Sequence, residues 1–376
     1  MSLPRVLHLS TARTWRGGEQ QVAYLAEELR GQGVAQLVVC AAGSPMQAWC
    51  AKAGIDHRVL GFRASFDPLN AKRLSRMARS WGAQLVHAHD SHGHTAAVLA
   101  NAFFGMGLPL VVSRRVDFPI SSGFSARWKY GHGSVKRILC VSAAIKAMTA
   151  KGLQHPEVLR TVHSGIDPAR FAHGADGRLH QELGLAPGTP IVGNVAALAP
   201  HKDLFTFIRM AERIHRQLPD VRFVLIGEGE LRAKLEEDTA AHGLGGILHF
   251  TGFRKDVDRL LPELDVMAMT SRTEGLGTSI LDAFAARVPV VATAAGGIPE
   301  LVEEGATGLL CPVGDDERLA AAVERLLRDA DLRTGLVESA VRKLQGFTRQ
   351  ATALATLREY QAVLSESGGA AKVNKV

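Results

Sequence analysis

The sequence predicts an α/β protein with two doubly wound, Rossmann-like domains that face one another across a cleft. Short apolar runs recur along the chain, and each is followed by a stretch whose apolar residues have helical spacing. The runs are apolar throughout rather than alternating, as in strands buried on both faces of a parallel sheet. The pattern is complete once by residue 168 and then starts again, which predicts two separate sheets.

The first domain is predicted over residues 1–168. Stretches such as 19–31 and 70–81 have helical spacing and are too long for hairpin turns, so strands and helices alternate. Parallel strands need such helical crossovers. The expected strands are 6–10, 37–41, 58–62, 85–89, 110–113, 138–142 and 159–163.

The second domain is predicted over residues 169–348, entered through the Gly- and Pro-rich stretch 173–188. A C-terminal helix at 349–366 is expected to pack back toward the first domain. The small, polar and basic residues 367–376 are expected to form a flexible tail. The expected strands are 191–196, 223–227, 248–251, 266–270, 290–293 and 308–312.

The composition is that of an ordinary globular protein, with 46% hydrophobic and 22% charged residues among 376. No apolar run reaches the length of a membrane span, and the first residues lack the pattern of a signal peptide. We therefore expect a cytoplasmic protein. The four cysteines form no CxxC pair, which argues against a disulfide framework or a cysteine-built zinc site.

The charge is unevenly distributed between the two halves. Residues 1–168 contain 20 Lys and Arg against 9 Asp and Glu, a net charge of +11, whereas the remainder has 24 against 28, a net charge of −4. A basic first half suggests an anionic partner, such as a phosphate-bearing substrate, a membrane surface or nucleic acid.

The segment SRTEGLGTSILDAFA (271–285) follows a predicted strand and carries the sharpest chemical signal. Gly275 and Gly277 allow the backbone to approach a ligand closely. The helix that begins next offers free N–H groups and the positive end of its dipole, which suit a diphosphate. Asp282 lies about two turns after Glu274, within reach of such a ligand. A solvated loop before an ordinary core helix is the alternative for this segment alone.

This segment resembles the E-x7-E region of glycosyltransferase family four, retaining enzymes of the GT-B fold. PVVATAAGGIPELV (289–302), TGLL (307–310), LIGEGELR (225–232) and SGIDPARF (164–171) are similar to further motifs of that family, in the same order. The resemblance implies that Glu274 binds hydroxyls of a donor sugar. Asp282 stands where the family has a glutamate on the nucleotide ribose. The donor-binding set that it implies is Gly17, Gly18, Asn194, Gly275, Leu276, Gly277, Thr278 and Asp282.

Lys202, in VAALAPHKD (195–203), matches the family's phosphate-binding lysine. An ammonium beside the departing phosphate stabilises the charge that grows in the transition state. Ala197 stands where the family has a partner arginine, and Arg115 or Arg13 is a candidate substitute. By itself, Lys202 also reads as an exposed lysine at a helix entry.

RGGEQQ (16–21) looks like the family's GGxE loop, although a plain tight turn is the alternative. The four histidines of HAHDSHGH (87–94) suggest a metal site, but the aspartate of this run falls in the wrong position for a metallohydrolase. The resemblance implies instead that His89 faces the donor sugar, with His87 as the substitute if the register is shifted. Asp256 and Asp258 form a DxD that is discounted as a metal site, so metal-independent catalysis is expected, with no cofactor.

A predicted helix presents four basic residues that could lie on an anionic membrane at the inner face, or form an ordinary solvated face: Lys72, Arg73, Arg76 and Arg79. No nucleic-acid motif appears.

The expected function is retaining transfer from a nucleotide diphosphate sugar, UDP favoured, to a hydroxyl acceptor such as a lipid- or envelope-linked saccharide. The alternatives are a nucleotide-sugar 2-epimerase of the same fold, a metallohydrolase using the 87–94 histidines, and a degenerate binding protein.

Overall fold

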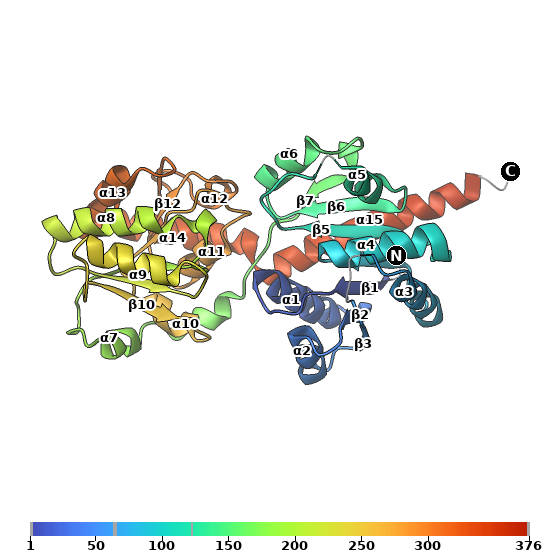
Figure 1. Ribbon diagram of the computed structural model, residues 1–376, viewed down its shortest axis with the longest axis horizontal. Coiled ribbons are helices and arrows are strands. Elements are labelled where there is room, and N and C mark those ends of the chain that lie inside the picture. Colours follow the sequence, from blue (N-terminus) through green and yellow to red (C-terminus); the bar gives the residue numbers. More distant parts are fainter. Residues whose placement is uncertain (1–2, 63–65, 122, 374–376) are drawn as a thin grey trace. The chain divides into compact units, whose positions relative to one another are not determined.

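A computed structural model of the protein describes residues 3–62, 66–121 and 123–373, with side chains as far as Ser367. These residues form two compact units. The N-terminal unit contains the chain up to Gly165 together with the segment from Arg349 onward, and the C-terminal unit is Ile166–Thr348. Figure 1 shows that each unit has its own sheet with helices packed against it.

The sheet of the N-terminal unit has seven strands in the order β3-β2-β1-β4-β5-β6-β7. Every neighbouring pair is parallel, as the uniformly apolar runs predicted. The strands are β1 (Arg5–Ser10), β2 (Ala35–Ala41), β3 (His57–Leu60), β4 (Leu85–Ala88), β5 (Leu110–Arg114), β6 (Val135–Cys140) and β7 (Leu159–Thr161).

Helices connect these strands, and several begin at a polar side chain that caps them. Asp90 accepts a hydrogen bond from the Gly93 N–H (2.8 Å) at the start of α4, and Ser142 accepts one from the Ile145 N–H (3.0 Å) at the start of α6. The helices are α1 (Gly17–Gly31), α2 (Pro45–Ala53), α3 (Pro68–Trp81), α4 (Ser91–Phe104), α5 (Phe124–Gly131), α6 (Ala143–Ala150) and the short η1 (Pro156–Val158).

The last helix, α15 (Arg349–Val373), belongs to the N-terminal unit. It packs on α1, where Arg349 Nη1 lies 2.9 Å from Glu27 Oε2, and buries Tyr360 completely. The helix continues past residue 366, where a flexible tail was expected, as far as Val373, and the Ser367 hydroxyl donates to the carbonyl of Val363 (2.8 Å) within it. Residues 374–376 of that expected tail lie outside the described residues.

The sheet of the C-terminal unit has six strands in the order β10-β9-β8-β11-β12-β13, again all parallel. The predicted α/β class with two parallel sheets is therefore confirmed. The strands are β8 (Ile191–Val195), β9 (Arg222–Ile226), β10 (Leu248–Gly252), β11 (Val266–Met269), β12 (Val290–Thr293) and β13 (Leu309–Cys311).

Helices cover both faces of this second sheet, and α8 and α13 pack against each other over one of them. Their fully buried members include Phe207 and Val323. The helices of the unit are η2 (Pro168–Phe171), α7 (Arg178–Leu183), η3 (Pro200–Lys202), α8 (Leu204–Gln217), α9 (Arg232–Ala241), α10 (Val257–Leu260), η4 (Leu261–Glu263), α11 (Thr278–Ala285), α12 (Ile298–Leu301), α13 (Asp316–Arg328), α14 (Ala330–Leu344) and η5 (Gln345–Phe347).

Each sheet has one point where the strand order reverses. In the N-terminal unit, β1 lies between β2 and β4, and in the C-terminal unit β8 lies between β9 and β11. Ligands of doubly wound sheets bind outside the carboxyl ends of the strands at such a point. The loops that follow β1 and β4, and those that follow β8 and β11, are therefore the places to look for a site.

Candidate active site

In the C-terminal unit, Lys202 and Glu274 form an ion pair beyond the carboxyl ends of β8 and β11. The Lys202 Nζ lies 2.5 Å from Glu274 Oε2, and the two side chains are 15% and 14% exposed. The Ser271 hydroxyl donates to the same carboxylate oxygen (3.2 Å). Because both charged groups are largely shielded from water, the attraction between them is only weakly screened.

The loops that carry this pair are tied together on both sides of Lys202. Arg272, in the loop after β11, donates from Nε to Asp203 Oδ2 (2.9 Å). The Thr270 hydroxyl donates to the carbonyl of Lys202 (3.1 Å). Sequence analysis did not identify Asp203 and Arg272 as part of this site, since only the fold brings their loops together.

The backbone of Glu274 rests against a glycine of the next βα loop. Gly296 has a φ of +54°, and a Cβ there would lie 2.0 Å from the carbonyl oxygen of Glu274, so only glycine fits. The N–H of Gly297 donates to that same carbonyl (3.0 Å). The Gly-Gly pair of the 289–302 motif therefore holds Glu274 in place.

Helix α11 begins immediately after this loop. Its N-cap, Gly277, has a φ of +91° and provides no side-chain cap, so the first N–H groups of the helix point out of its positive end. Leu276 is buried beside Gly275 and Gly277, and Thr278 is half-buried at the first helical position. The loop and helix start thus present backbone donors next to Glu274, an arrangement that suits a phosphate group.

Asp282 lies on the same helix, half-buried. Burial raises the pKa of its carboxyl to about 7, the nearby Arg170 opposes that rise, and Asp258 adds to it. Near neutral pH, Asp282 is therefore present in both forms, and it can donate as well as accept a hydrogen bond. A hydroxyl-bearing ligand such as a ribose can use either form.

Asn194, at the end of β8, is 2% exposed. Its side-chain carbonyl oxygen has no hydrogen-bond partner among the described residues. A buried acceptor without a donor is costly to a fold, and this one lies at the strand edge where ligands of such sheets bind.

In the N-terminal unit, three imidazoles converge on β1 and β4: His8 lies within β1, His87 lies within β4, and His89 directly follows β4. Ring nitrogens of His8, His87 and His89 all lie within 4.8 Å of one another. His8 Nδ1 is 2.9 Å from His89 Nε2, and the ring centroids of His87 and His89 are 3.9 Å apart. Sequence analysis missed His8, because only the pairing of β1 with β4, which sets His8 opposite His87, reveals it.

His87 is enclosed by two hydroxyl groups. Its Nδ1 lies 2.5 Å from the Tyr360 hydroxyl on α15, and its Nε2 lies 2.8 Å from the Ser113 hydroxyl on β5. His87 is 1% exposed and His89 is 8% exposed. Of this pair, His89 is thus the one nearer to solvent, just beyond the end of β4 rather than within the strand as expected.

Burial keeps all three imidazoles neutral. It lowers the pKa of His8 to about 3 and the pKa values of His87 and His89 well below their usual range, and the positive charge of Arg115 lowers the latter two further. Neutral imidazoles are suitable ligands for a transition metal. Within the described part of the chain, these three are the group of histidine, cysteine and acidic residues that could hold one.

The run 87–94 does not form one cluster. His94 packs with its ring edge-on to Tyr130, at a centroid distance of 4.8 Å, apart from the three imidazoles. The DxD carboxylates are also engaged elsewhere: Asp256 binds Arg254 (2.7 Å), and Asp258 lies 3.4 Å from Arg170.

The loop after β1 leads into α1 through Gly17 and Gly18. A Cβ at either glycine would meet no atom within 4 Å, so nothing in the protein itself requires glycine there. The Glu19 carboxylate accepts a hydrogen bond from the Arg16 N–H (2.8 Å) and closes the turn. The space beside both glycines is open to a ligand.

Comparison with known proteins identifies the class. Residues 176–343 match the model of the glycosyl transferases group 1, and residues 15–170 match that of glycosyltransferase family 4. The chain is 31% identical to an alpha-D-kanosaminyltransferase of Streptomyces kanamyceticus over 72% of its length and 74% of the relative's. It is 29% identical to a 2-deoxystreptamine N-acetyl-D-glucosaminyltransferase of Streptomyces fradiae, over 94% and 93% of the two chains.

A solved structure of HepE from Anabaena, in complex with UDP and glucose, has the same fold. Its TM-score is 0.81 at 22% identity, with 96% of this chain and 99% of that one covered. The protein therefore belongs to the group 1 glycosyl transferases and is a glycosyltransferase. Since the relatives are sugar transferases, a nucleotide-sugar epimerase is not favoured.

Proposed function

We propose that the protein transfers a sugar from a UDP-sugar to a hydroxyl acceptor, with retention of configuration and without a metal ion. The observation that carries this proposal is the Lys202–Glu274 pair at the carboxyl edge of the second sheet. It places an ammonium, a carboxylate and the start of α11 side by side, which is what a sugar joined to a diphosphate requires.

Each member of this group has a separate task. Glu274 accepts hydrogen bonds from hydroxyls of the donor sugar. Lys202, together with the N–H groups at the start of α11, stabilises the diphosphate as it departs. The acceptor hydroxyl attacks the anomeric carbon from the side of the leaving group, the bond from that carbon to the β-phosphate oxygen breaks, and the phosphate oxygen takes the hydroxyl proton.

The nucleotide is assigned to the same unit. Asp282 takes the ribose hydroxyls, and Asn194, Gly275, Leu276, Gly277 and Thr278 complete the donor-binding set. UDP is favoured because the Anabaena protein with this fold binds UDP and glucose. The half-buried Asp282, with its pKa raised to about 7, supports hydrogen bonding to a neutral hydroxyl rather than to a cation.

His89, Gly17 and Gly18 belong to the other unit, and their role rests on the family resemblance. We assign His89 to the donor sugar and the open Gly17–Gly18 turn to the diphosphate or acceptor. Some cation other than the family's arginine is needed, since Ala197 stands at that position. Arg115 and Arg13 remain the candidates.

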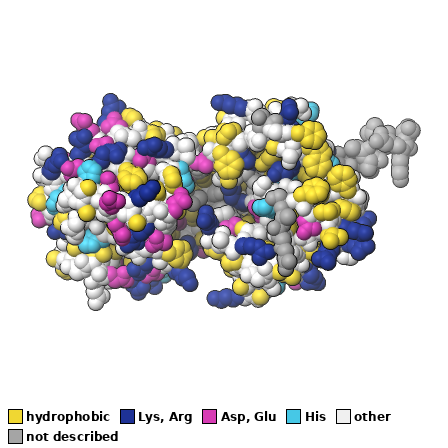
Figure 2. Space-filling model, viewed as in Figure 1, with side chains coloured by type: hydrophobic (Ala, Val, Ile, Leu, Met, Phe, Trp, Pro, Cys, Tyr) yellow, Lys and Arg dark blue, Asp and Glu magenta, His cyan; other side chains and the backbone are white. Residues whose placement is uncertain are grey.

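The acceptor is proposed to be a saccharide carried at an anionic membrane surface. Lys72, Arg73, Arg76 and Arg79 on α3 are all exposed. Figure 2 shows hydrophobic side chains gathered over α4 and α5, with basic side chains beside them over α3. We call this the aromatic face; its members are Phe103 (66% exposed), Phe124 (80%) and the half-buried Trp128.

Exposed aromatic rings next to Lys and Arg are the features of a surface that rests on anionic lipid. Phe103 of α4 stacks on Trp128 of α5, with ring centroids 6.2 Å apart, so the two helices present one continuous apolar surface. No helix in the described part of the chain is long and apolar enough to cross a membrane.

The experiment that tests the function is a donor screen. The protein is incubated with UDP-sugars and with GDP- and ADP-sugars, with and without membrane extracts as a source of acceptor. Acceptor-dependent UDP release, with the donor's anomeric configuration kept in the product, is the expected result. An epimerised donor without acceptor, an inverted product or preference for another nucleotide would contradict the proposal.

A further inference from the structure

Arg115, just beyond the end of β5, holds His89 with two donor groups. Its Nη1 donates to the carbonyl oxygen of His89 (3.2 Å), and its Nη2 lies 3.4 Å from His89 Nδ1. A guanidinium has five N–H donors and no acceptor. Burial lowers the pKa of Arg115 only to about 10, so it stays charged near neutral pH. His89 Nδ1 must therefore accept.

A neutral imidazole carries one proton, so an accepting Nδ1 places that proton on Nε2. His89 Nε2 faces His8 Nδ1 at 2.9 Å, which makes His89 the donor and His8 the acceptor. By the same rule, the proton of His8 lies on its Nε2. This atom is buried and has no hydrogen-bond partner among the described residues.

We propose that Arg115 is the positioning residue of the imidazole cluster. It selects the tautomer of His89 that carries the proton on Nε2, and through His89 it selects the matching tautomer of His8. Arg115 donates to His89, and His89 donates to His8, so the hydrogen bonds of the cluster run in one direction. The second hydrogen bond, to the His89 carbonyl, fixes the backbone from which the ring projects.

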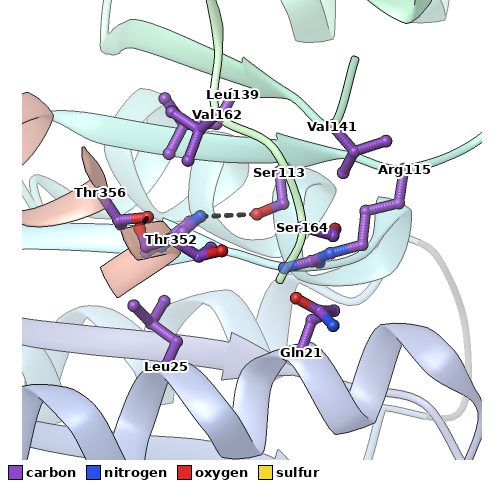
Figure 3. Close-up of a pocket in the computed structure, with 11 residues that line it drawn as sticks. Gln21, Leu25, Ser113, Arg115, Leu139, Val141, Val162, Ser164, Thr352 and Thr356 are labelled. Atoms are coloured by element: carbon purple, nitrogen blue, oxygen red, sulfur yellow. Dashed lines mark hydrogen bonds between the residues drawn. The ribbon is translucent and has the colours of Figure 1, made fainter. Parts of the chain in front are cut away.

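The Arg115 side chain lines a small polar cavity. Figure 3 shows the guanidinium reaching toward Gln21 and Ser164 in a cavity of about 20 Å³, which is also lined by Ser113, Thr352 and Thr356. That volume accommodates about one water molecule, and the lining is polar enough to hold it. The negative charges of Glu19 and Asp90 oppose the effect of burial on the pKa of Arg115 and help to keep it charged.

The same tautomer works against a metal ion on this cluster. A metal bound at His89 Nε2 would move the ring proton to Nδ1, where it would face the donor-only guanidinium at 3.4 Å. Two donors would then oppose each other in a buried place, which is unfavourable. Arg115 thus opposes metal binding by His8, His87 and His89, although their ring nitrogens lie close enough together.

The tautomer also limits what His89 can do in the reaction, an extension that rests on the proposed function. With its Nε2 proton donated to His8 and its Nδ1 accepting from Arg115, His89 has both ring nitrogens engaged and does not serve as a general base. This agrees with the proposed path of the acceptor proton to the phosphate oxygen.

The test reads the tautomer directly, by long-range ¹H–¹⁵N NMR of the histidine side chains in the full-length protein near neutral pH. A His89→Gln variant assigns the His89 signals. The expected result is a bare Nδ1 and a protonated Nε2 in the wild type and in Arg115→Lys, because lysine is also only a donor. Arg115→Met, which keeps the length but removes the donors, is expected to lose this single tautomer.

Arg127→Met, at an exposed arginine of α5, is the matched control and is expected to keep the wild-type spectrum. In kinetics, Arg115→Met is expected to lower kcat with little change in KM, and Arg115→Lys to restore it. A proton on His89 Nδ1 in the wild type, or an unchanged tautomer in Arg115→Met, would overturn the proposal. If Arg115→Met does not fold, the position of the His89 proton in the wild type and in Arg115→Lys still tests the proposal. Failure of the donor screen would leave this NMR result standing, so the two proposals are tested separately.

Discussion

The ammonium of Lys202 lies 2.5 Å from the carboxylate of Glu274, although 72 residues separate them along the chain. The parallel sheet brings them together, because β8 and β11 are neighbours whose carboxyl ends share one edge. The two residues lie in separate sequence motifs, and only the fold brings them together as an ion pair.

Glu274→Gln is expected to lower kcat by roughly 10²–10³-fold, as for the loss of one group that stabilises a transition state. The amide cannot hold the buried Lys202 ammonium as the carboxylate does. The rate of UDP release with the best donor measures the effect. Glu236→Gln, in an exposed pair with Arg232 (2.5 Å), is the control and should retain full activity. Equal rates for both variants would remove Glu274 from the site.

Gly296→Ala is expected to lower stability by more than about 1 kcal/mol and to reduce activity, because its Cβ would strike the Glu274 carbonyl. Gly305→Ala is a matched control: Gly305 also has a positive φ (+69°), but a Cβ there meets no atom within 4 Å. Urea unfolding and donor turnover are measured on both. A loss of activity in Gly305→Ala as large as in Gly296→Ala would argue against the contact with Glu274.

Asp282 is expected to make stability fall as pH rises from about 4 to about 7. Its pKa is raised from 3.8 to about 7 in the folded protein, so over this window the folded state binds more protons than the unfolded state. The loss of stability from ionising Asp282 is absent below about pH 4 and complete above about pH 7. Asp282→Asn should therefore gain stability relative to the wild type at about pH 8 and not at about pH 4. A pH-independent difference in the free energy of unfolding would contradict the raised pKa.

The aromatic face is expected to bind anionic vesicles. Phe103→Ser combined with Phe124→Ser should weaken sedimentation with vesicles rich in phosphatidylglycerol, and pure phosphatidylcholine vesicles should bind poorly in every case. Phe253→Ser is the control, since Phe253 is 70% exposed but lies in the C-terminal unit. An equal loss of binding in the control, or no preference for anionic lipid, would dismiss this face as the contact.

Chelation is expected to leave turnover unchanged, because in the proposed mechanism Lys202 and the N–H groups at the start of α11, rather than a metal ion, stabilise the negative charge of the diphosphate. UDP release is compared before and after treatment with EDTA, and after addition of Mg²⁺ or Mn²⁺. Loss of activity with EDTA that either ion restores would contradict metal-independent transfer.

Much of the fold was predictable because its signals are local. In the described part of the chain, each strand overlaps a predicted run. The central strands are apolar because they are buried on both faces. The loops that carry Glu274, Lys202 and His89 were found because glycines and polar residues directly follow those runs. The predicted end of the last helix at residue 366 was wrong: the small, polar and basic residues that follow favoured a tail, yet α15 continues to Val373.

The sequence by itself determined the class of fold, the family and the separate loops that are proposed to carry the chemistry, because periodicity, glycine and motif order are properties of neighbouring residues. Only the tertiary structure decided which side chains meet. His8 joins His89 and Tyr360 reaches His87 across strands and helices far apart in the chain. Such contacts depend on strand order and register, and burial then decides the protonation of the groups that they enclose.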